Sequence, residues 1–336
     1  MRAYELAGRG LDTLTLVDRP MPQPGPGQVL VRIRATSLNY RDLLIAREQY
    51  GRGGTKRPLV PLSDGAGEVV EVGPGVTHLR PGDRVAGAFF QKWVDGPFDS
   101  QKAASALGGA IDGVLAEHVV LEEAGAVRFP DFLSFEEAAT LPCAGVTAWV
   151  GLMVLGELRA GETVLAMGTG GVSVFALQIA KSVGARVILT SGEDRKLERG
   201  KALGADEAIN YRETPEWDAR ARELTGDRGV DQLLEVGGAA TLPTSLRAVR
   251  EGGHITLVGL LTGTPADREA ARKNDRGVRV DSVYVGSVRQ FETLNEAVER
   301  SRLHPVVDRV FPFDEAKQAY EFLEGRRHFG KVVIRV

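Results

Sequence analysis

The first third of the chain consists of short apolar runs that alternate with polar residues and are bounded by glycine and proline. Residues 29–34 alternate as Val-Leu-Val-Arg-Ile-Arg after a Pro-Gly-Pro-Gly turn, and residues 68–72 end at a Gly-Pro-Gly turn. Residues 81–87 and 115–120 have the same character. Alternation with a period of two predicts strands with one solvent-exposed face. The spacing of these strands predicts a small β-barrel or sandwich.

From Ser134 onward the pattern changes to strands that alternate with helices. Ser134 and Glu137 have the spacing of a capping box, which predicts a helix start. Apolar strands are predicted at 163–167, 186–190, 207–209, 230–235 and 254–258, and helices at 172–183, 195–203 and 241–249. This order predicts an α/β fold with a parallel, doubly wound sheet.

The last fifty or so residues return to a different pattern, with helices predicted at 291–300 and 314–323 and a final strand at 331–336. That strand needs a sheet to join, so we expect the chain to return to its first domain after building the second. The predicted boundaries are 1–126 with 288–336 for the first domain and 127–287 for the inserted one. Residues 265–279 are rich in charge and predict an exposed loop before a strand at 278–285.

Composition narrows the class of protein. The chain has 336 residues, 43% of them hydrophobic, with a formal net charge of −3. These values favour two globular domains and give no reason to expect nucleic acid or a membrane surface as a partner. The charged start of the sequence and the absence of long apolar runs predict a cytoplasmic protein. Cys143 is the single cysteine, which suits a reducing compartment.

A glycine-rich turn lies between the predicted strand at 163–167 and the predicted helix at 172–183. It reads Gly168-Thr169-Gly170-Gly171-Val172-Ser173. Glycines allow the backbone to approach a pyrophosphate closely, and the helix that follows presents free N–H groups to it. The turn therefore predicts a dinucleotide site, with a plain strand-to-helix turn as the alternative.

The choice of dinucleotide depends on the end of the next strand. An acidic residue there would bind the ribose hydroxyls of NAD, but the sequence has Thr190-Ser191-Gly192. Ser191 and Lys196, with Arg195 as a second basic candidate, could bind a 2′-phosphate, so NADPH is favoured. Glu193 is the argument for NADH, and Lys196 could instead be a solvated helix residue.

Several motifs in order resemble those of the medium-chain dehydrogenase/reductase superfamily over nearly the whole chain. They are Asn39-Tyr40-Arg41-Asp42, Asp64-Gly65-Ala66-Gly67, Arg80-Pro81-Gly82-Asp83-Arg84-Val85, the Gly168 turn, and Gly330-Lys331-Val332-Val333. The resemblance implies a GroES-like β-barrel catalytic domain, an inserted Rossmann domain and a substrate cleft between the two.

The resemblance also implies where a catalytic zinc would be bound. Zinc-dependent members have a cysteine at the position of Asn39, a histidine at that of Ser63, and commonly a cysteine near Cys143. Asn39 and Ser63 are poor zinc ligands, and the five histidines show no ligand spacing. We therefore expect no metal, and we interpret Cys143 as a small apolar residue, with a reactive thiol as the alternative.

The zinc-free quinone oxidoreductase-like branch of the superfamily fits these substitutions, and it implies roles for individual residues. Asn39 and Tyr50 would be the catalytic hydrogen-bond donors, while Tyr40, Asp64 and Trp93 would line the substrate pocket. The following residues would contact the cofactor: Thr147, Gly168, Thr169, Gly170, Gly171, Val172, Ser191, Lys196, Tyr211, Gly237, Gly259, Leu260, Phe329 and Lys331. In each case a purely structural role is the alternative; Tyr50, for example, could simply cover a barrel edge.

The expected activity follows from the missing metal. Without a Lewis acid to polarise a carbonyl, the acceptor must already be disposed to take hydride, as quinones and α,β-unsaturated carbonyls are. Hydride transfer from NADPH to such a small-molecule acceptor is the predicted reaction. An alcohol/ketone dehydrogenase and a non-catalytic NADPH-binding protein are the alternatives. A homodimer, or else a tetramer, is expected to form through the strand at 278–285.

Overall fold

The structure is a computed structural model that describes residues 1–50, 57–238, 240–258, 269 and 276–336. The chain divides into two compact units, residues Met1–Val146 with Val285–Val336, and residues Thr147–Tyr284. The first unit is thus discontinuous in sequence, as the terminal strand predicted. It extends past the predicted boundary at 126 because residues of the following segment pack onto it: the Ser37 hydroxyl donates to the Ala139 carbonyl at 2.9 Å.

The first unit is built on a mixed sheet, in which β14 and β15 are parallel and the other described pairs are antiparallel. Its elements are β1 (Arg2–Leu6), β2 (Leu14–Asp18), β3 (Gln28–Ser37), α1 (Tyr40–Ala46), β4 (Asp64–Val72), β5 (Arg84–Gly87), α2 (Ser100–Ala103), β6 (His118–Glu122), β7 (Ala126–Arg128), α3 (Phe135–Ala138), η3 (Leu141–Gly145), α10 (Val288–Ser301), β14 (Val307–Pro312), α11 (Ala316–Glu324) and β15 (Lys331–Arg335). Among the described residues the sheet order is β14-β15-β3-β4-β5-β7, with β6 also paired to β3 and with β1 and β2 forming a separate hairpin.

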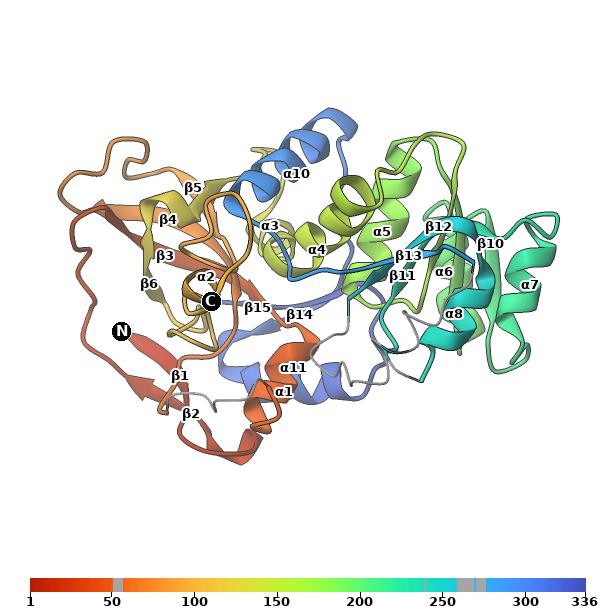
Figure 1. Cartoon of the computed structure of the whole chain (residues 1–336). Helices are drawn as coiled ribbons and strands as arrows, with labels where there is room; N and C mark the ends of the chain where they lie inside the picture. Colours follow the sequence, from red (N-terminus) through yellow and green to blue (C-terminus); the bar gives the residue numbers. More distant parts are fainter. Residues whose placement is uncertain (51–56, 239, 259–268, 270–275) are drawn as a thin grey trace. The chain divides into compact units, whose positions relative to one another are not determined.

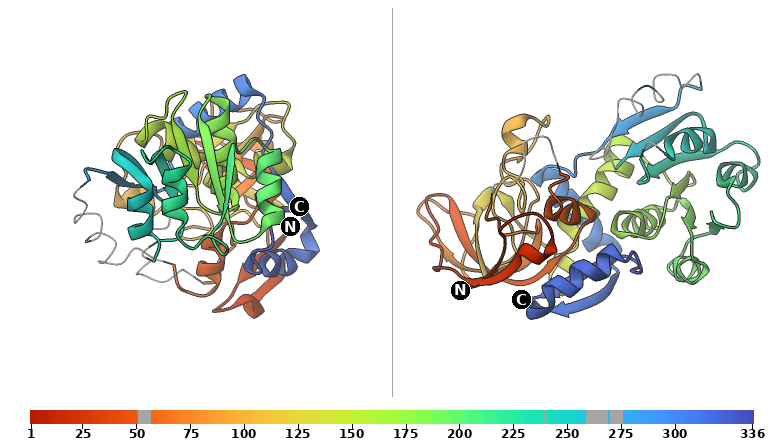
Figure 2. Two further views of the ribbon diagram at one scale, coloured as in Figure 1. Left: turned by 90° about the vertical axis from the view of Figure 1, so that its right-hand side faces the viewer. Right: turned by 90° about the horizontal axis from the view of Figure 1, so that it is seen from below.

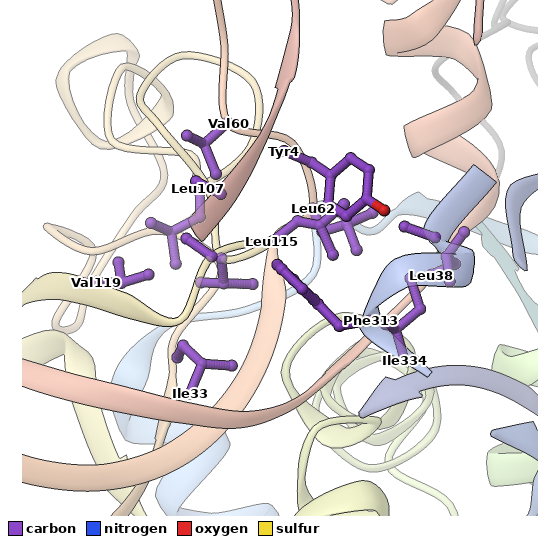
Figure 3. Packing of buried hydrophobic residues seen from close by; sticks show 14 of the residues in the cluster. Tyr4, Ile33, Leu38, Val60, Leu62, Leu107, Leu115, Val119, Phe313 and Ile334 are labelled. Atoms are coloured by element: carbon purple, nitrogen blue, oxygen red, sulfur yellow. The ribbon is translucent and has the colours of Figure 1, made fainter. Parts of the chain in front are cut away.

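One apolar core holds this unit together. It combines side chains from the N-terminal strands with others from the last part of the chain, which explains why the two segments fold as one body. Figure 3 shows Tyr4 and Leu38 close to Phe313 and Ile334 in this cluster. Tyr4 and Phe313 form an edge-to-face aromatic pair, with ring centroids 5.2 Å apart.

The second unit is a parallel sheet with helices along it (Figures 1 and 2). Its elements are α4 (Val146–Trp149, which begins at the junction), η4 (Val150–Leu155), β8 (Thr163–Ala166), α5 (Gly171–Ser182), β9 (Arg186–Ser191), α6 (Asp194–Ala202), β10 (Glu207–Asn210), α7 (Trp217–Glu223), β11 (Val230–Glu235), α8 (Leu242–Ala248), β12 (Val249–Leu257) and β13 (Arg279–Ser282). In the described part, the strand order is β10-β9-β8-β11-β12-β13 and neighbouring strands are parallel.

This order confirms the predicted α/β class and the doubly wound sheet. The first strand in sequence, β8, lies in the middle and the chain winds outward in both directions, which is the arrangement that places a ligand at the carboxyl ends of the central strands. β8 is buried at every position because helices cover a parallel sheet on both faces. β13 is an edge strand of the described sheet, and association of subunits through it stays a prediction.

No helix in the described ranges is both long and apolar enough to span a membrane.

Candidate active site

The amide of Asn39 and the ammonium of Lys331 meet inside the first unit. β15 pairs with β3 in antiparallel fashion, with Val333 opposite Ser37. The same register places Lys331, at the start of β15, opposite Asn39, two positions past the end of β3. The Lys331 Nζ donates to Asn39 Oδ1 at 2.6 Å and to the Leu38 carbonyl at 2.7 Å. Lys331 is only 3% exposed. The sequence predicted Lys331 as a cofactor contact, and here its ammonium is bound by the unit that carries Asn39.

Asp64 balances this buried charge. Its Oδ2 lies 3.7 Å from the Lys331 Nζ and accepts the Cys143 backbone N–H at 3.3 Å, while Oδ1 accepts the Ser63 hydroxyl at 2.7 Å. Asp64 is fully buried at the start of β4, opposite Ser37 in the sheet register. Asp64 was predicted to line a substrate pocket, and its described contacts are with protein groups.

The three positions that would supply a zinc site in related enzymes do not fit a metal. The amide oxygen of Asn39 already accepts from a buried ammonium, and the Ser63 hydroxyl is engaged by Asp64. Desolvation, reinforced by the Asp64 carboxylate, raises the pKa of the Cys143 thiol. Cys143 is then the single candidate ligand of the three positions, which is too few for a zinc site. Across the described residues, no group of three or more histidine, cysteine or carboxylate side chains could hold an ion.

A second buried charge pair lies beneath Tyr50. The Arg41 guanidinium carbon is 4.8 Å from the centre of the Tyr50 ring and 4.5 Å from that of Phe89, so the cation is stacked with two aromatic rings. Its Nη1 donates to the Leu107 carbonyl at 3.1 Å and lies 3.6 Å from Asp42 Oδ1. Tyr50 packs, half-buried, against the core of the first unit. Arg41 is part of the resemblance motif, but no role was predicted for it.

Asp42 links this pair to Asn39. As the third residue of α1 it accepts the Asn39 backbone N–H at 2.7 Å, which closes the first turn of the helix and fixes the backbone from which the Asn39 side chain projects. Burial raises the pKa of Asp42 to about 6, against the opposing effects of Arg41 and of the Asn39 N–H.

The other two predicted pocket residues differ in exposure. Tyr40 is 51% exposed at the start of α1. Trp93 is buried in an aromatic cluster with Phe90 and Phe98, against which Cys143 packs, and its Nε1 donates to the Gly96 carbonyl at 2.8 Å. These contacts give Trp93 a structural role, and contact with a substrate stays a prediction.

In the second unit the glycine turn has the geometry that a dinucleotide requires. It joins β8 to α5, with Gly170 as the N-cap residue of this twelve-residue helix. Gly168 has a φ of +74°, which other residues rarely adopt. A Cβ at Gly170 would meet no heavy atom within 4 Å, so the backbone borders open space beside the first turn of α5. Thr169, Gly171 and Val172 lie in the same turn, and the arrangement fits a pyrophosphate.

Ser173 stands where the dinucleotide-binding pattern G-x-G-x-x-G has its third glycine, and its hydroxyl takes over the packing role of that glycine. It donates back to the Met167 carbonyl at 2.5 Å and is buried, which ties the start of α5 to the end of β8. The departure from a strict glycine pattern therefore leaves the turn intact.

The end of β9 gathers the polar groups predicted to choose between coenzymes. β10 runs parallel to β9 with Asn210 opposite Ser191, so the residues that follow both strands are neighbours. A Cβ built on Gly192 would lie 2.8 Å from Arg212 Nε and 2.9 Å from the Tyr211 hydroxyl, which shows how closely both side chains approach this glycine. The arrangement offers a hydroxyl and a guanidinium to a 2′-phosphate.

Ser191 and Lys196 are tied to Glu193. The Ser191 Oγ accepts the Glu193 backbone N–H at 3.2 Å, and the Lys196 Nζ lies 3.0 Å from Glu193 Oε1. Glu193 thus neutralises the cation that was predicted to bind phosphate, which leaves Arg212 as the better-placed basic group at this edge of the sheet. The resemblance also implies this role, because Asn210-Tyr211-Arg212 resembles the segment in which a tyrosine and its basic neighbour hold the 2′-phosphate in the quinone oxidoreductase-like branch.

A buried carboxylate shapes the loop after β11. Glu235 is fully buried, and its Oε1 accepts the backbone N–H groups of Gly237 at 2.6 Å and Gly238 at 3.0 Å and the Thr241 hydroxyl at 2.7 Å. A Cβ at Gly237 would lie 2.3 Å from Thr241 Oγ1, so a larger residue there would displace the Thr241 hydroxyl from Glu235. Sequence reasoning singled out Gly237 but missed Glu235, because a glutamate at the end of an apolar strand carries no recognisable motif.

The remaining predicted cofactor residues are less informative. Thr147 is buried on α4, and Phe329 is buried in the first unit. Gly259 and Leu260 lie outside the described residues.

Two family models cover most of the chain. Residues 25–131 match the alcohol dehydrogenase GroES-like domain, and residues 171–300 match the zinc-binding dehydrogenase model. A zinc-type alcohol dehydrogenase-like protein of Schizosaccharomyces pombe is 42% identical over 334 residues, covering 97% of this chain and 96% of that protein. The chain therefore belongs to the medium-chain dehydrogenase/reductase superfamily of oxidoreductases, as the motifs indicated.

Solved structures share the fold over the full length of this chain. An NAD-dependent alcohol dehydrogenase is 36% identical with a TM-score of 0.89, and the alignment covers 100% of both chains. A quinone oxidoreductase from Pseudomonas syringae pv. tomato DC3000 is 28% identical with a TM-score of 0.84, with 99% of that chain covered. A mycobacterial protein complexed with NADPH is also 28% identical, with a TM-score of 0.82 and 100% of that chain covered.

Proposed function

We propose that the protein is an NADPH-dependent, zinc-independent oxidoreductase that transfers hydride to a quinone or an α,β-unsaturated carbonyl. The observation that carries the proposal is the buried ammonium of Lys331 on the amide oxygen of Asn39, at the position where zinc-dependent relatives have a cysteine ligand. A cation already occupies the surroundings in which a second, divalent cation would have to bind, and Asp64 offers a single carboxylate to compensate both.

The coenzyme supplies a hydride when bound, and the residues of the chain bind and orient it. The open side of Gly170 and the first turn of α5 would hold the pyrophosphate, and Tyr211 with Arg212 would hold the 2′-phosphate. The NADPH complex of a mycobacterial relative supports this choice. The NAD-dependent relative is the argument against it, and Glu193 is the residue of this chain that would favour NAD.

Asn39 and Tyr50 are the proposed donors to the acceptor oxygen. When hydride reaches an activated carbon of the acceptor, negative charge develops on the conjugated oxygen, and hydrogen bonds aimed at that oxygen stabilise the transition state. One proton, from the Tyr50 hydroxyl or from water, completes the reduction. A substrate without conjugation would gain too little from two neutral donors, which is why quinones and enones are proposed rather than simple ketones.

The similarity to zinc-type and NAD-dependent alcohol dehydrogenases favours a second candidate, the interconversion of alcohols and ketones. The decisive experiment measures oxidation of NADPH and NADH with 9,10-phenanthrenequinone, enones, aldehydes and ketones, together with elemental analysis of the same preparation. We expect turnover of quinones or enones with NADPH and no stoichiometric zinc. Stoichiometric zinc with chelator-sensitive oxidation of alcohols would replace the proposal by the second candidate.

A matched pair of variants tests the donors. Tyr50→Phe and Asn39→Ala should each reduce turnover, while Thr15→Val, which removes an exposed hydroxyl on β2, should not. If Tyr50→Phe and Asn39→Ala both leave quinone and enone reduction untouched, the assignment of these donors is wrong.

A further inference from the structure

The environment of Lys331 is unusual for a lysine. Its Nζ is surrounded by the Asn39 amide oxygen at 2.6 Å, the Leu38 carbonyl at 2.7 Å and Asp64 Oδ2 at 3.7 Å. Both Lys331 and Asp64 have side chains that are 3% exposed or less. Burying an ammonium costs free energy unless it is hydrogen-bonded and its charge is balanced, and here two carbonyl oxygens accept its hydrogen bonds while the Asp64 carboxylate balances its charge.

This arrangement determines how the Asn39 side chain is oriented. An ammonium has three donors and no acceptor, so the amide atom that faces it must be the oxygen, and the NH₂ group must point away. That NH₂ group is also buried, and within the described part of the structure the Asn39 Nδ2 has no hydrogen-bond partner. A buried donor without an acceptor is costly in a folded protein and marks a place where a ligand oxygen can bind.

The charge of Lys331 also changes the strength of that donor. A cation on the amide oxygen draws electron density from the nitrogen, which makes the two Nδ2 hydrogens more positive and strengthens any hydrogen bond that they donate. The Asp42 carboxylate fixes the backbone of the same residue from the other side by accepting the Asn39 N–H at 2.7 Å. Position and polarity of one amide are thus set by two charged groups that need not touch a substrate.

We propose that Lys331 is a positioning residue for the reaction rather than a cofactor ligand: its buried ammonium holds the Asn39 amide in a single orientation and polarises it as the donor to the acceptor oxygen. This inference rests on the proposed function. The ammonium keeps its three hydrogens throughout, because the hydride comes from the coenzyme and the proton from Tyr50 or water. Lys331 contributes only fixed positive charge behind the amide that meets the developing oxyanion.

A double-mutant cycle separates this role from direct catalysis or simple support of the fold. Lys331→Met and Asn39→Leu replace each polar group by an apolar one, and Ser37→Ala is the control because it removes a buried hydrogen bond of β3 to the Ala139 carbonyl that does not involve Asn39. We expect Lys331→Met to lower kcat by about 100-fold, the size of effect found for one oxyanion donor, with KM for NADPH within about twofold of the original. Ser37→Ala should keep the original kcat.

The decisive comparison is made in the Asn39→Leu background. If Lys331 acts through Asn39, Lys331→Met causes no further loss of kcat there, because the amide that it orients is already absent. The same factor of loss in both backgrounds overturns the proposal, as does an unchanged kcat in Lys331→Met alone. A rise in KM for NADPH at constant kcat would assign Lys331 to the cofactor instead. Lys331→Gln takes the place of Lys331→Met throughout if the latter does not fold.

A second readout needs no turnover. In ¹⁵N-labelled protein the Asn39 side-chain NH₂ gives a pair of signals, assigned by its loss in Asn39→Leu. We expect Lys331→Met to shift this pair and Ser37→Ala to leave it in place. If the original protein reduces none of the acceptors with NADPH, the proposed function alone is refuted. If the Asn39 signals are unchanged in Lys331→Met, the role of Lys331 is refuted.

Discussion

Replacing Arg212 should change which coenzyme the protein prefers. The Arg212 Nε and the Tyr211 hydroxyl both approach Gly192 at the end of β9, where the adenosine ribose of a bound dinucleotide would lie. A hydrogen bond to a charged group contributes about 1.5–3 kcal/mol. Because Arg212 is exposed, the lower end applies, and about 1.4 kcal/mol corresponds to a factor of about ten.

We therefore expect Arg212→Ala to lower kcat/KM for NADPH about tenfold and to leave kcat/KM for NADH almost unchanged. Steady-state kinetics with both coenzymes and one quinone measure the ratio directly. Arg220→Ala removes an exposed arginine that is paired with Glu223 on α7 and serves as the control for net charge. An equal loss with both coenzymes, or no loss with either, would refute the placement of the 2′-phosphate beside Arg212.

Two buried carboxylates should affect stability with opposite dependence on pH. Burial alone would raise the pKa of Asp231. Hydrogen bonds to its carboxylate, of which the one from Arg228 has the largest effect, instead lower this pKa to about 2. The ionised Asp231 therefore stabilises the fold above the unfolded pKa near 4, and this stabilisation is lost as the pH falls toward 2. Asp231→Asn should lower the free energy of unfolding by about 2–3 kcal/mol at pH 7 and by less at pH 3, as measured by denaturant unfolding. An equal loss at both pH values would contradict the assignment. The pKa of Asp42 is raised to about 6, so its charge destabilises the fold above that pH. Relative to Asp42→Asn, the original protein should lose about 2.4 kcal/mol between pH 4 and pH 7, and parallel pH profiles of the two proteins would exclude this effect.

The elements that the sequence predicted well are those whose pattern is local. The turn at Gly168 needed a strand before it and a helix after it, and β8 and α5 are both present. The capping box of Ser134 and Glu137 also forms, with hydrogen bonds of 3.1 Å and 2.8 Å, although α3 ends at Ala138.

Features that depend on distant contacts could not be predicted in this way. α1 was missed because six of its seven residues are buried, including Arg41 and Asp42, so the helix lacks the polar face that periodicity analysis detects. The contact of Lys331 with Asn39 joins residues 292 positions apart and depends on the register of β15 against β3. The pairing of Lys196 with Glu193 is close in sequence, but nothing in the pattern showed that it would form in place of a phosphate contact.

The discontinuous first unit has a consequence for the order in which the protein can mature. β15 lies between β14 and β3 in the sheet, yet the ribosome makes it only after the whole of the second unit, residues Thr147–Tyr284. In a nascent chain that has reached residue 300, the part of β3 that pairs with β15 is therefore unpaired, and the Asn39 amide lacks its contact with Lys331. The catalytic centre proposed here would be among the last features to form during synthesis, and until then this edge of β3 is open to pairing with another chain.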